Sequence, residues 1–462
     1  MNNYRPLNIV IMVVAGLAFI RLVGFMLSFG EGCLQMDFCA FYTAGEASRA
    51  GLSPYINHFS HTPPVWDGVG VFQHSRFLYP PLVAVLFHPL ALLPYHVAKY
   101  FWMLANLLAV FASLCVAIRV SAPTLRNHYS WGMILFLLMF SPLLILLERG
   151  QIDGISLVLV TTSIALIATG KRPGVSGVLI ALATLLKLHT ILLLPFLVLR
   201  GKWRVIAGFV IGTLFILMLS VMLCGRSALV RYAKVEFPRI SAFGEGGTRD
   251  MRADNSVISS LRPVSSLVTK EGRTYQLEHF KFVINASVAR TRIGQWTRDS
   301  LSKLGLPSSM SIVSLLIFGG FFSLAVLFQW RMRFSVCLKP ETEFLYWQLA
   351  LVIVLLSAPL TWVMNTIWLV ALIPFVVNKL MEREATGRTS AWGITLITLG
   401  LLVAAAPDYL AFPQQLPPSR MSQLAGDCKY VIAELAILAG LAIHLWSSGV
   451  PRLKEQESQA ID

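Results

Sequence analysis

Long blocks of apolar residues constrain this chain more than any other feature of its sequence. They lie, for example, at residues 9–29, 205–224, 311–328 and 431–446, and several reach the roughly 18 apolar residues that mark a membrane-span candidate. Of the 462 residues, 56% are hydrophobic and 13% are charged, whereas soluble domains carry about a quarter charged residues. The sequence therefore predicts a polytopic integral membrane protein and excludes a soluble domain.

The apolar blocks predict an all-α membrane fold, a single domain over residues 1–462 with about twelve transmembrane helices. The expected spans are 8–29, 96–119, 131–147, 154–169, 173–187, 189–199, 204–224, 310–330, 344–359, 363–378, 389–406 and 427–447. The blocks 173–187 and 189–199 are short, so they form either one long span or two short spans broken at Lys187-Leu188-His189. The second alternative fits the charge distribution better.

Lysine and arginine residues sort by loop, which explains most of the net charge of +15 without a nucleic-acid partner. The bias places the N-terminus and the tail 450–462 in the cytoplasm. It leaves two long extracytoplasmic loops, 30–95 and 225–309, because long loops cross the membrane largely regardless of their charge. Cys33 and Cys39 flank a short segment of the first loop, and a disulfide between them is an option if that loop is extracytoplasmic.

Polar residues at membrane depth are expected to gather at the extracytoplasmic face. Ionisable groups at that depth are costly and usually functional. The candidates are Asp37, Tyr79, Arg149, Gln151, Asp153, Lys187, His189, Asn255, Arg262, Trp362 and Asn365. One acidic residue among several cations and aromatic rings suits an anionic, lipid-linked substrate.

Each of these residues also has a purely structural interpretation. Asp37 is placed as the N-cap of a helix over 38–50 that stops at Gly51, and capping alone would explain it. Lys187 would then snorkel to the interface, and His189 would be a packing histidine. Arg149 would pair with the adjacent Glu148 at a helix end. The functional interpretation depends on the convergence of these residues.

Several short motifs, taken in order, resemble glycosyltransferase family 87. They are Asp37-Phe38-x-x-Phe41-Tyr42-x-Ala44, Gly51-x-x-x-Tyr55, Phe77-Leu78-Tyr79-Pro80-Pro81, Pro89-Leu90-x-x-Leu93-Pro94, Gly150-Gln151-x-Asp153, Leu185-Leu186-Lys187, Asn255-Ser256 with Arg262, and Pro359-x-x-Trp362. The resemblance covers about residues 8–380. One departure is clear: relatives commonly carry a His-His pair after the tryptophan, where this chain has Met364-Asn365.

The resemblance implies a GT-C fold and a hexosyltransferase that takes its sugar, with mannose as the expected one, from a polyprenyl-phosphate donor. It also implies an acidic catalyst in the first outer loop, which matches Asp37, and we expect it to act as general base in a single inverting displacement. The acceptor would be a hydroxyl of a glycolipid or glycan. No cofactor or metal is implied, and the expected location is a bacterial inner membrane with the active site on the periplasmic side.

Three alternatives remain open from the sequence. The first is a transporter or flippase of lipid-linked sugars, which should show internal repeats and polar groups near the midplane. No repeat is visible. The second is a GT-C transferase that uses another sugar, such as arabinose or glucose. The third is a structural or assembly membrane protein with a decayed site, which the Met364-Asn365 departure keeps open.

Overall fold

The computed structural model describes residues 5–33, 35–55, 77–123, 130–238, 266–268, 274–276, 287–332, 338–359, 361–381, 388–406 and 420–448. The elements within these ranges are helical apart from two short strands. They are α1 (Arg5–Gly32), α2 (Met36–Arg49), α3 (Pro81–Leu86), η2 (Leu90–Leu92), α4 (Tyr95–Ser121), α5 (Ser130–Met139), α6 (Ser141–Arg149), α7 (Asp153–Thr169), α8 (Pro173–Leu186), η4 (Leu188–Leu193), α9 (Leu194–Leu199), α10 (Trp203–Cys224), α11 (Arg226–Arg231), η5 (Tyr232–Glu236), β1 (Ser266–Val268), β2 (Thr274–Gln276), η8 (Val288–Arg290), α13 (Arg292–Lys303), α14 (Met310–Met332), α15 (Pro340–Ser357), η9 (Val363–Leu372), α16 (Ile373–Met381), α17 (Arg388–Ala405) and α19 (Arg420–Ser448).

The chain is a multi-pass helical membrane protein, but the described residues contain fewer full-length spans than the twelve predicted. By length and composition, six helices can cross a membrane, or seven if the bent pair α5 and α6 counts as one. Each predicted segment coincides with helical structure. Several of these helices are short, however, and α5 meets α6 at a 54° bend. Apolar composition alone does not reveal such breaks.

One short antiparallel strand pair corrects the all-α prediction. β1 pairs with β2 through Ser266↔Gln276, Leu267↔Tyr275 and Val268↔Thr274. Both strands fall inside the segment 225–309, which the sequence analysis assigns to the second outer loop.

The helices surround an interior built from α15 and η9. The α15 side chains from Glu343 to Ser357 are all buried, and so are those of η9. A helix that is apolar on every side fits this position, because it has no face to turn to water. By contrast, α1 and α14 expose many apolar side chains, as expected for helices at the lipid boundary.

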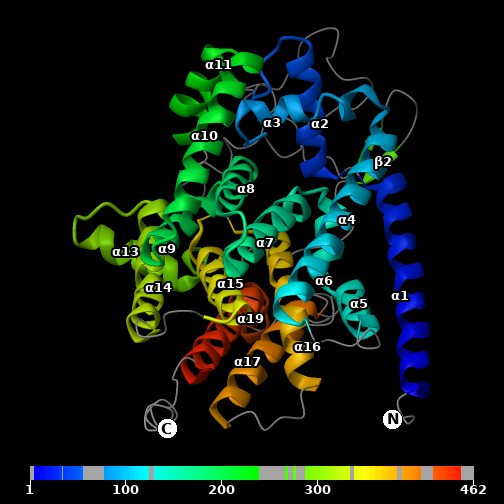
Figure 1. Cartoon of the computed structure of the whole chain (residues 1–462). Helices are drawn as coiled ribbons and strands as arrows, with labels where there is room; N and C mark the ends of the chain where they lie inside the picture. The colour runs from blue at the N-terminus through cyan, green and yellow to red at the C-terminus, as the bar shows by residue number, and fades with distance from the viewer. Residues whose placement is uncertain are drawn as a thin grey trace.

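The helix α2, which carries the candidate residue Asp37, lies toward one end of the molecule. Figure 1 shows α2, α3 and α11 together at the end opposite the N-terminus. The break predicted at Lys187 is present, because α8 ends at Leu186 and a 3₁₀ turn begins at Leu188. Within residues 79–94 the chain forms the two short helices α3 and η2.

The predicted option of a Cys33–Cys39 disulfide is not realised, since both residues are free thiols. Cys33 Sγ contacts the carbonyl oxygen of Glu148 at 3.7 Å. The first of the two thiols is therefore used to pack the end of α1 against α6.

Candidate active site

Asp37 lies in the first turn of α2 and does not cap it. The helix begins at Met36, and its N-cap residue is Gln35, which has a left-handed φ of 55°. A left-handed non-glycine residue is uncommon and persists only where its surroundings hold it. Gln35 is held in this way, because it is fully buried and its Nε2 donates to the carbonyl oxygen of Leu147 at 2.8 Å. The capping interpretation of Asp37 is therefore wrong.

The Asp37 carboxylate points instead to α6, which is distant in the sequence. Arg149 Nε donates to Asp37 Oδ2 at 3.1 Å, and the two side chains are 16% and 9% exposed. Arg149 thus does not serve only as a local partner of Glu148. Among the described residues, Arg149 is the hydrogen-bond and ion-pair partner of this carboxylate, and it contacts Oδ2, so Oδ1 is left for another donor.

Gly150, at the end of α6, permits this close approach of α6 to α2. Its φ is 66°, and a Cβ added to it would lie 2.5 Å from Phe38 Cβ and 3.3 Å from Gln35 Cβ. Trp102 Nε1 also donates to the Gly150 carbonyl oxygen at 2.7 Å. A glycine is therefore required both by the left-handed backbone and by the contact with α2.

Gly150→Ala is expected to lower the midpoint of thermal unfolding in detergent and to reduce activity, because Phe38 and Gln35 are both buried and cannot yield easily. The matched control is Gly170→Ala, since Gly170 has φ 68° and nothing within 4 Å of an added Cβ. Both variants carry the left-handed penalty of about 1–2 kcal/mol. Equal unfolding midpoints for the two variants would contradict a tight α2–α6 contact.

A second ion pair lies on the other side of Gly150, at the start of α7. Lys187 Nζ lies 2.9 Å from Asp153 Oδ2 and donates to Gln151 Oε1 at 3.2 Å. Asp153 is fully buried and Lys187 is 9% exposed. The snorkelling interpretation of Lys187 is therefore wrong: the break after α8 turns this ammonium inward to a buried carboxylate.

Asn365 completes this cluster from η9. Its Nδ2 donates to Asp153 Oδ1, and its Oδ1 accepts from the Trp362 backbone N–H at 2.6 Å. Asn365 is fully buried, and both the oxygen and the nitrogen of its side-chain amide are hydrogen-bonded within the protein. The sequence analysis placed Asn365 among substrate-binding residues, whereas its contacts are those of a positioning residue that holds Asp153.

Tyr79 joins the cluster from the first predicted outer loop. Its hydroxyl donates to Gln151 Oε1 at 3.4 Å, and its carbonyl oxygen accepts from the Tyr55 hydroxyl at 2.9 Å. Burial raises the pKa of Tyr79 to about 12; nearby Lys187 opposes the rise, and the carboxylates of Asp153 and Asp37 add to it. The phenol therefore stays protonated, and a hydrogen-bond donor, at neutral pH.

Trp362 joins the hydrogen-bond network just described through its backbone N–H, and His189 makes a ring contact. The His189 ring packs on Trp368 at 5.1 Å between centroids, which favours the packing interpretation of this histidine. Trp362 is partly buried against the main core, and its backbone is held by Asn365. Asn255 and Arg262 lie outside the described residues.

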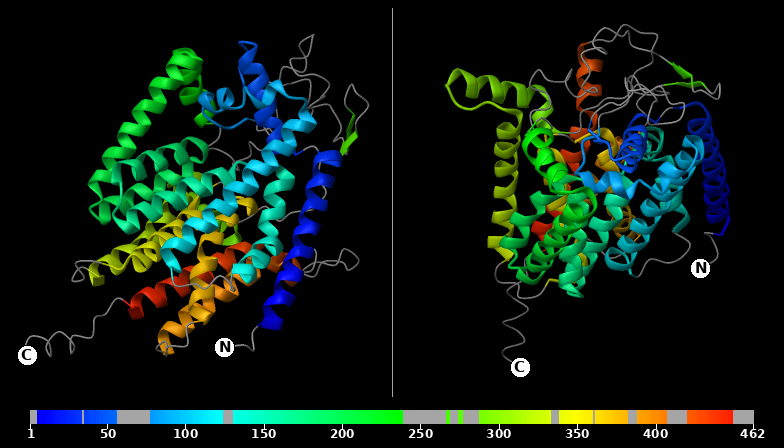
Figure 2. Two further views of the ribbon diagram at one scale, coloured as in Figure 1. Left: turned by 45° about the vertical axis from the view of Figure 1, so that its right-hand side comes forward. Right: turned by 90° about the horizontal axis from the view of Figure 1, so that it is seen from above.

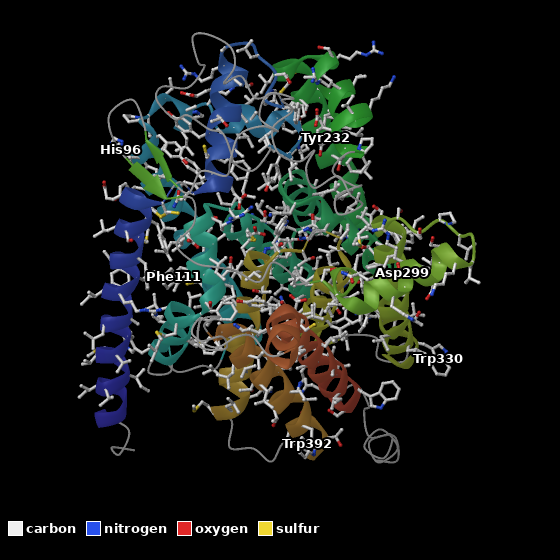
Figure 3. All side chains as sticks on the ribbon, turned by 180° about the vertical axis from the view of Figure 1, so that it is seen from behind. His96, Phe111, Tyr232, Asp299, Trp330 and Trp392 are labelled. Atoms are coloured by element: carbon white, nitrogen blue, oxygen red, sulfur yellow. The ribbon has the colours of Figure 1, made fainter. Side chains whose placement is uncertain are left out.

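Three residues that support the site were not among the predicted ones. Gln35 and Trp102 hold the two ends of the Asp37–Arg149 contact, and no local pattern in the sequence marks either of them. Tyr55 had a signal, since it closes the Gly51-x-x-x-Tyr55 motif. Its ring stacks on Tyr232 of the π-helical turn η5 at 5.9 Å, and Figure 3 labels Tyr232 near the same end of the molecule as α2.

One of the comparisons with known proteins, the match to a family model, agrees with the resemblance seen in the motifs. The model of glycosyltransferase family 87 matches residues 77–274. No curated protein sequence matches the chain. Among solved structures, the crystal structure of ArnT from Cupriavidus metallidurans in the apo state is similar at 12% identity and a TM-score of 0.33, covering 96% of this chain and 76% of that one.

The family match includes five of the candidate residues with described contacts: Tyr79, Arg149, Gln151, Asp153 and Lys187. Asp37 precedes the matched segment but contacts it through Arg149. Over residues 77–274, the resemblance of this membrane protein to glycosyltransferase family 87 is confirmed.

Proposed function

We propose that this chain is a membrane hexosyltransferase that moves a sugar, with mannose as the expected one, from a polyprenyl-phosphate donor to a hydroxyl of a glycolipid or glycan. The observation that carries the proposal is the pairing of a buried carboxylate, Asp37, with a cation of the family-matched segment, Arg149. A second cation, Lys187, lies in the adjacent network.

Asp37 is proposed as the general base. Its Oδ2 is held by Arg149, and Oδ1 is the oxygen that would accept the proton from the acceptor hydroxyl. The acceptor oxygen would then form a bond to the anomeric carbon while the bond from that carbon to the phosphate oxygen breaks. Polyprenyl phosphate leaves as the anion, so a second acid is not needed.

Lys187 and Arg149 are proposed to stabilise the leaving phosphate. An ammonium has three N–H donors, and Lys187 has Asp153, Gln151 and the Tyr79 hydroxyl as neighbours, so a phosphate oxygen would replace one of the two neutral partners. The ion pairs hold both cations in place before the reaction, so no side chain has to reorient as negative charge develops on the leaving phosphate.

Charge balance supports a further cation in the complex with the donor. Asp37 and Asp153 carry two negative charges and Arg149 and Lys187 two positive ones, so the four side chains cancel. The phosphodiester of the donor adds one negative charge. Arg262, predicted from the sequence to line the site, is the proposed source of the balancing charge.

The proposed active site faces the extracytoplasmic side, with the inner membrane of a bacterium as the proposed location. The positive-inside bias of the loops supports this side. Asp37 is carried by α2, which lies at the end of the molecule opposite the N-terminus (Figure 1).

The test is sugar transfer by the purified protein in detergent, supplied with polyprenyl-phosphate-mannose and a membrane lipid extract. We expect a new mannosylated product with the lipid-linked donor and none with a nucleotide-linked mannose. A panel with glucose and arabinose donors identifies the sugar. Absence of transfer from every lipid-linked sugar, together with donor flipping in vesicles, would contradict the proposal and favour the flippase.

A further inference from the structure

The helix α13 presents an apolar face that no described part of the chain covers. Ile293, Trp296 and Leu304 are 62%, 71% and 73% exposed, and their spacing places them on one side of the helix axis. Gln295 and Ser302 lie on the opposite side by the same spacing. A tryptophan exposed to this degree beside two exposed aliphatic residues is a patch that needs a partner.

This helix is fixed to the molecule along a different face. A Cβ on Gly294 would lie 2.0 Å from the Ala289 carbonyl oxygen, so the backbones of α13 and η8 are in direct contact. Leu301 packs against Ala289, Met310 and Val313 at the start of α14. The exposed apolar face is therefore held in a defined orientation.

The direction of α13 differs from that of the candidate spans next to it. Seen from above, α13 runs across the direction that α1 and α14 share, and it projects from the body beside the end of α14 (Figure 2). In Figure 3, its residue Asp299 lies at the margin of the molecule. This is the orientation of a helix parallel to a membrane surface.

Because α13 lies next to the N-terminal end of the candidate span in α14, it is placed at a membrane boundary. The candidate span Met310–Leu327 begins shortly after α13 ends at Lys303, and it exposes Leu315 and Leu316 to its surroundings. Trp330 is 70% exposed and lies twenty residues beyond Met310, which corresponds to about 30 Å of helix, the thickness of the hydrocarbon layer. Exposed tryptophans at both ends of this distance match the aromatic belts of membrane proteins.

We propose that α13 is an interfacial helix whose Ile293–Trp296–Leu304 face is immersed where phospholipid headgroups meet acyl chains. The exposed apolar residues continue from α13 through Leu306, 51% exposed, to the exposed face of α14, so a single lipid surface covers both. Arg298 and Lys303 suit the phosphates of the headgroups. The partner is the membrane leaflet at the N-terminal end of α14, and the inference does not depend on the proposed reaction.

The test uses tryptophan fluorescence of the full chain in nanodiscs. The spectrum of Trp296→Phe is subtracted from that of the wild type, which isolates Trp296 among eleven tryptophans. In lipid brominated near the carbonyl end of the acyl chain, we expect this difference signal to lose most of its intensity, and aqueous iodide to have little effect on it. The same subtraction for Trp330→Phe is the positive control.

Two results would overturn the inference. Quenching of the Trp296 signal by iodide but not by brominated lipid would place the helix in water. Protection from both quenchers would mean that protein, such as a second copy of this chain, covers the apolar face.

Discussion

Asp37→Asn is expected to reduce sugar transfer by about 10²–10⁴-fold, the usual contribution of a positioned general base. Asparagine keeps the size of the side chain and an oxygen that accepts from Arg149 Nε, so the α2–α6 contact survives. It cannot take a proton from the acceptor hydroxyl. The measurement is the initial rate of transfer from the lipid-linked donor, alongside the midpoint of thermal unfolding.

Measuring kcat and KM for the donor separately distinguishes a general-base role of Asp37 from a purely structural one. Loss of the negative charge weakens the attraction of residue 37 for Arg149, so KM for the donor should stay unchanged or fall while kcat drops. The control is Glu46→Gln, which neutralises another carboxylate on α2 and should retain most of the activity. A folded Asp37→Asn enzyme with wild-type kcat would remove Asp37 from the chemistry.

Much of the architecture follows from residue patterns that act over short distances. Apolar length identified helical structure at each predicted span, because the bilayer requires backbone groups to be satisfied within a segment. The charge distribution favoured a break at Lys187, and the break is present. The sequence also predicted a cluster of Tyr79, Gln151, Asp153 and Lys187, because polar groups at the same depth of a helix bundle need one another as hydrogen-bond partners.

The partners within the cluster were not predictable in the same way. Asp37 has the local pattern of an N-cap, but a left-handed Gln35 moves the helix start and frees the carboxylate for a residue 112 positions away. Asn365 replaces a histidine that relatives commonly carry, and only the fold shows that its amide joins η9 to α7 through Asp153. Such contacts depend on how α2, α6, α7 and η9 pack, which residue spacing does not encode.

The described residues contain fewer full-length spans than predicted for a related reason. Hydropathy responds equally to a helix that faces lipid and to one enclosed by protein. α8 and α9 are too short to cross a membrane of about 30 Å at 1.5 Å per residue, yet they are as apolar as full spans. Because α8 ends at Leu186, the Lys187 break lies inside the protein, where the ammonium pairs with the Asp153 carboxylate.

Lys187→Met is expected to have the second large effect, and it should act on stability and catalysis together. Removing the ammonium leaves the fully buried Asp153 carboxylate with the Asn365 amide as its remaining side-chain donor among the described residues. Breaking one side of a buried ion pair typically costs about 3–5 kcal/mol. Loss of a positioned donor to the leaving phosphate should lower kcat/KM by about 10²–10³-fold. Thermal unfolding and donor kinetics are the two measurements.

A double variant distinguishes these two contributions. Lys187→Met combined with Asp153→Asn removes both charges and keeps an oxygen that can accept from Asn365, so much of the lost stability should return. If Lys187 serves the leaving phosphate, transfer stays at the level of the single variant even though the protein is stable again. If Lys187 only neutralises Asp153, activity returns with stability. The second result would leave Arg149 as the phosphate partner within the described site and would reassign the whole Lys187–Asp153–Asn365 chain to holding α7, α8 and η9 together.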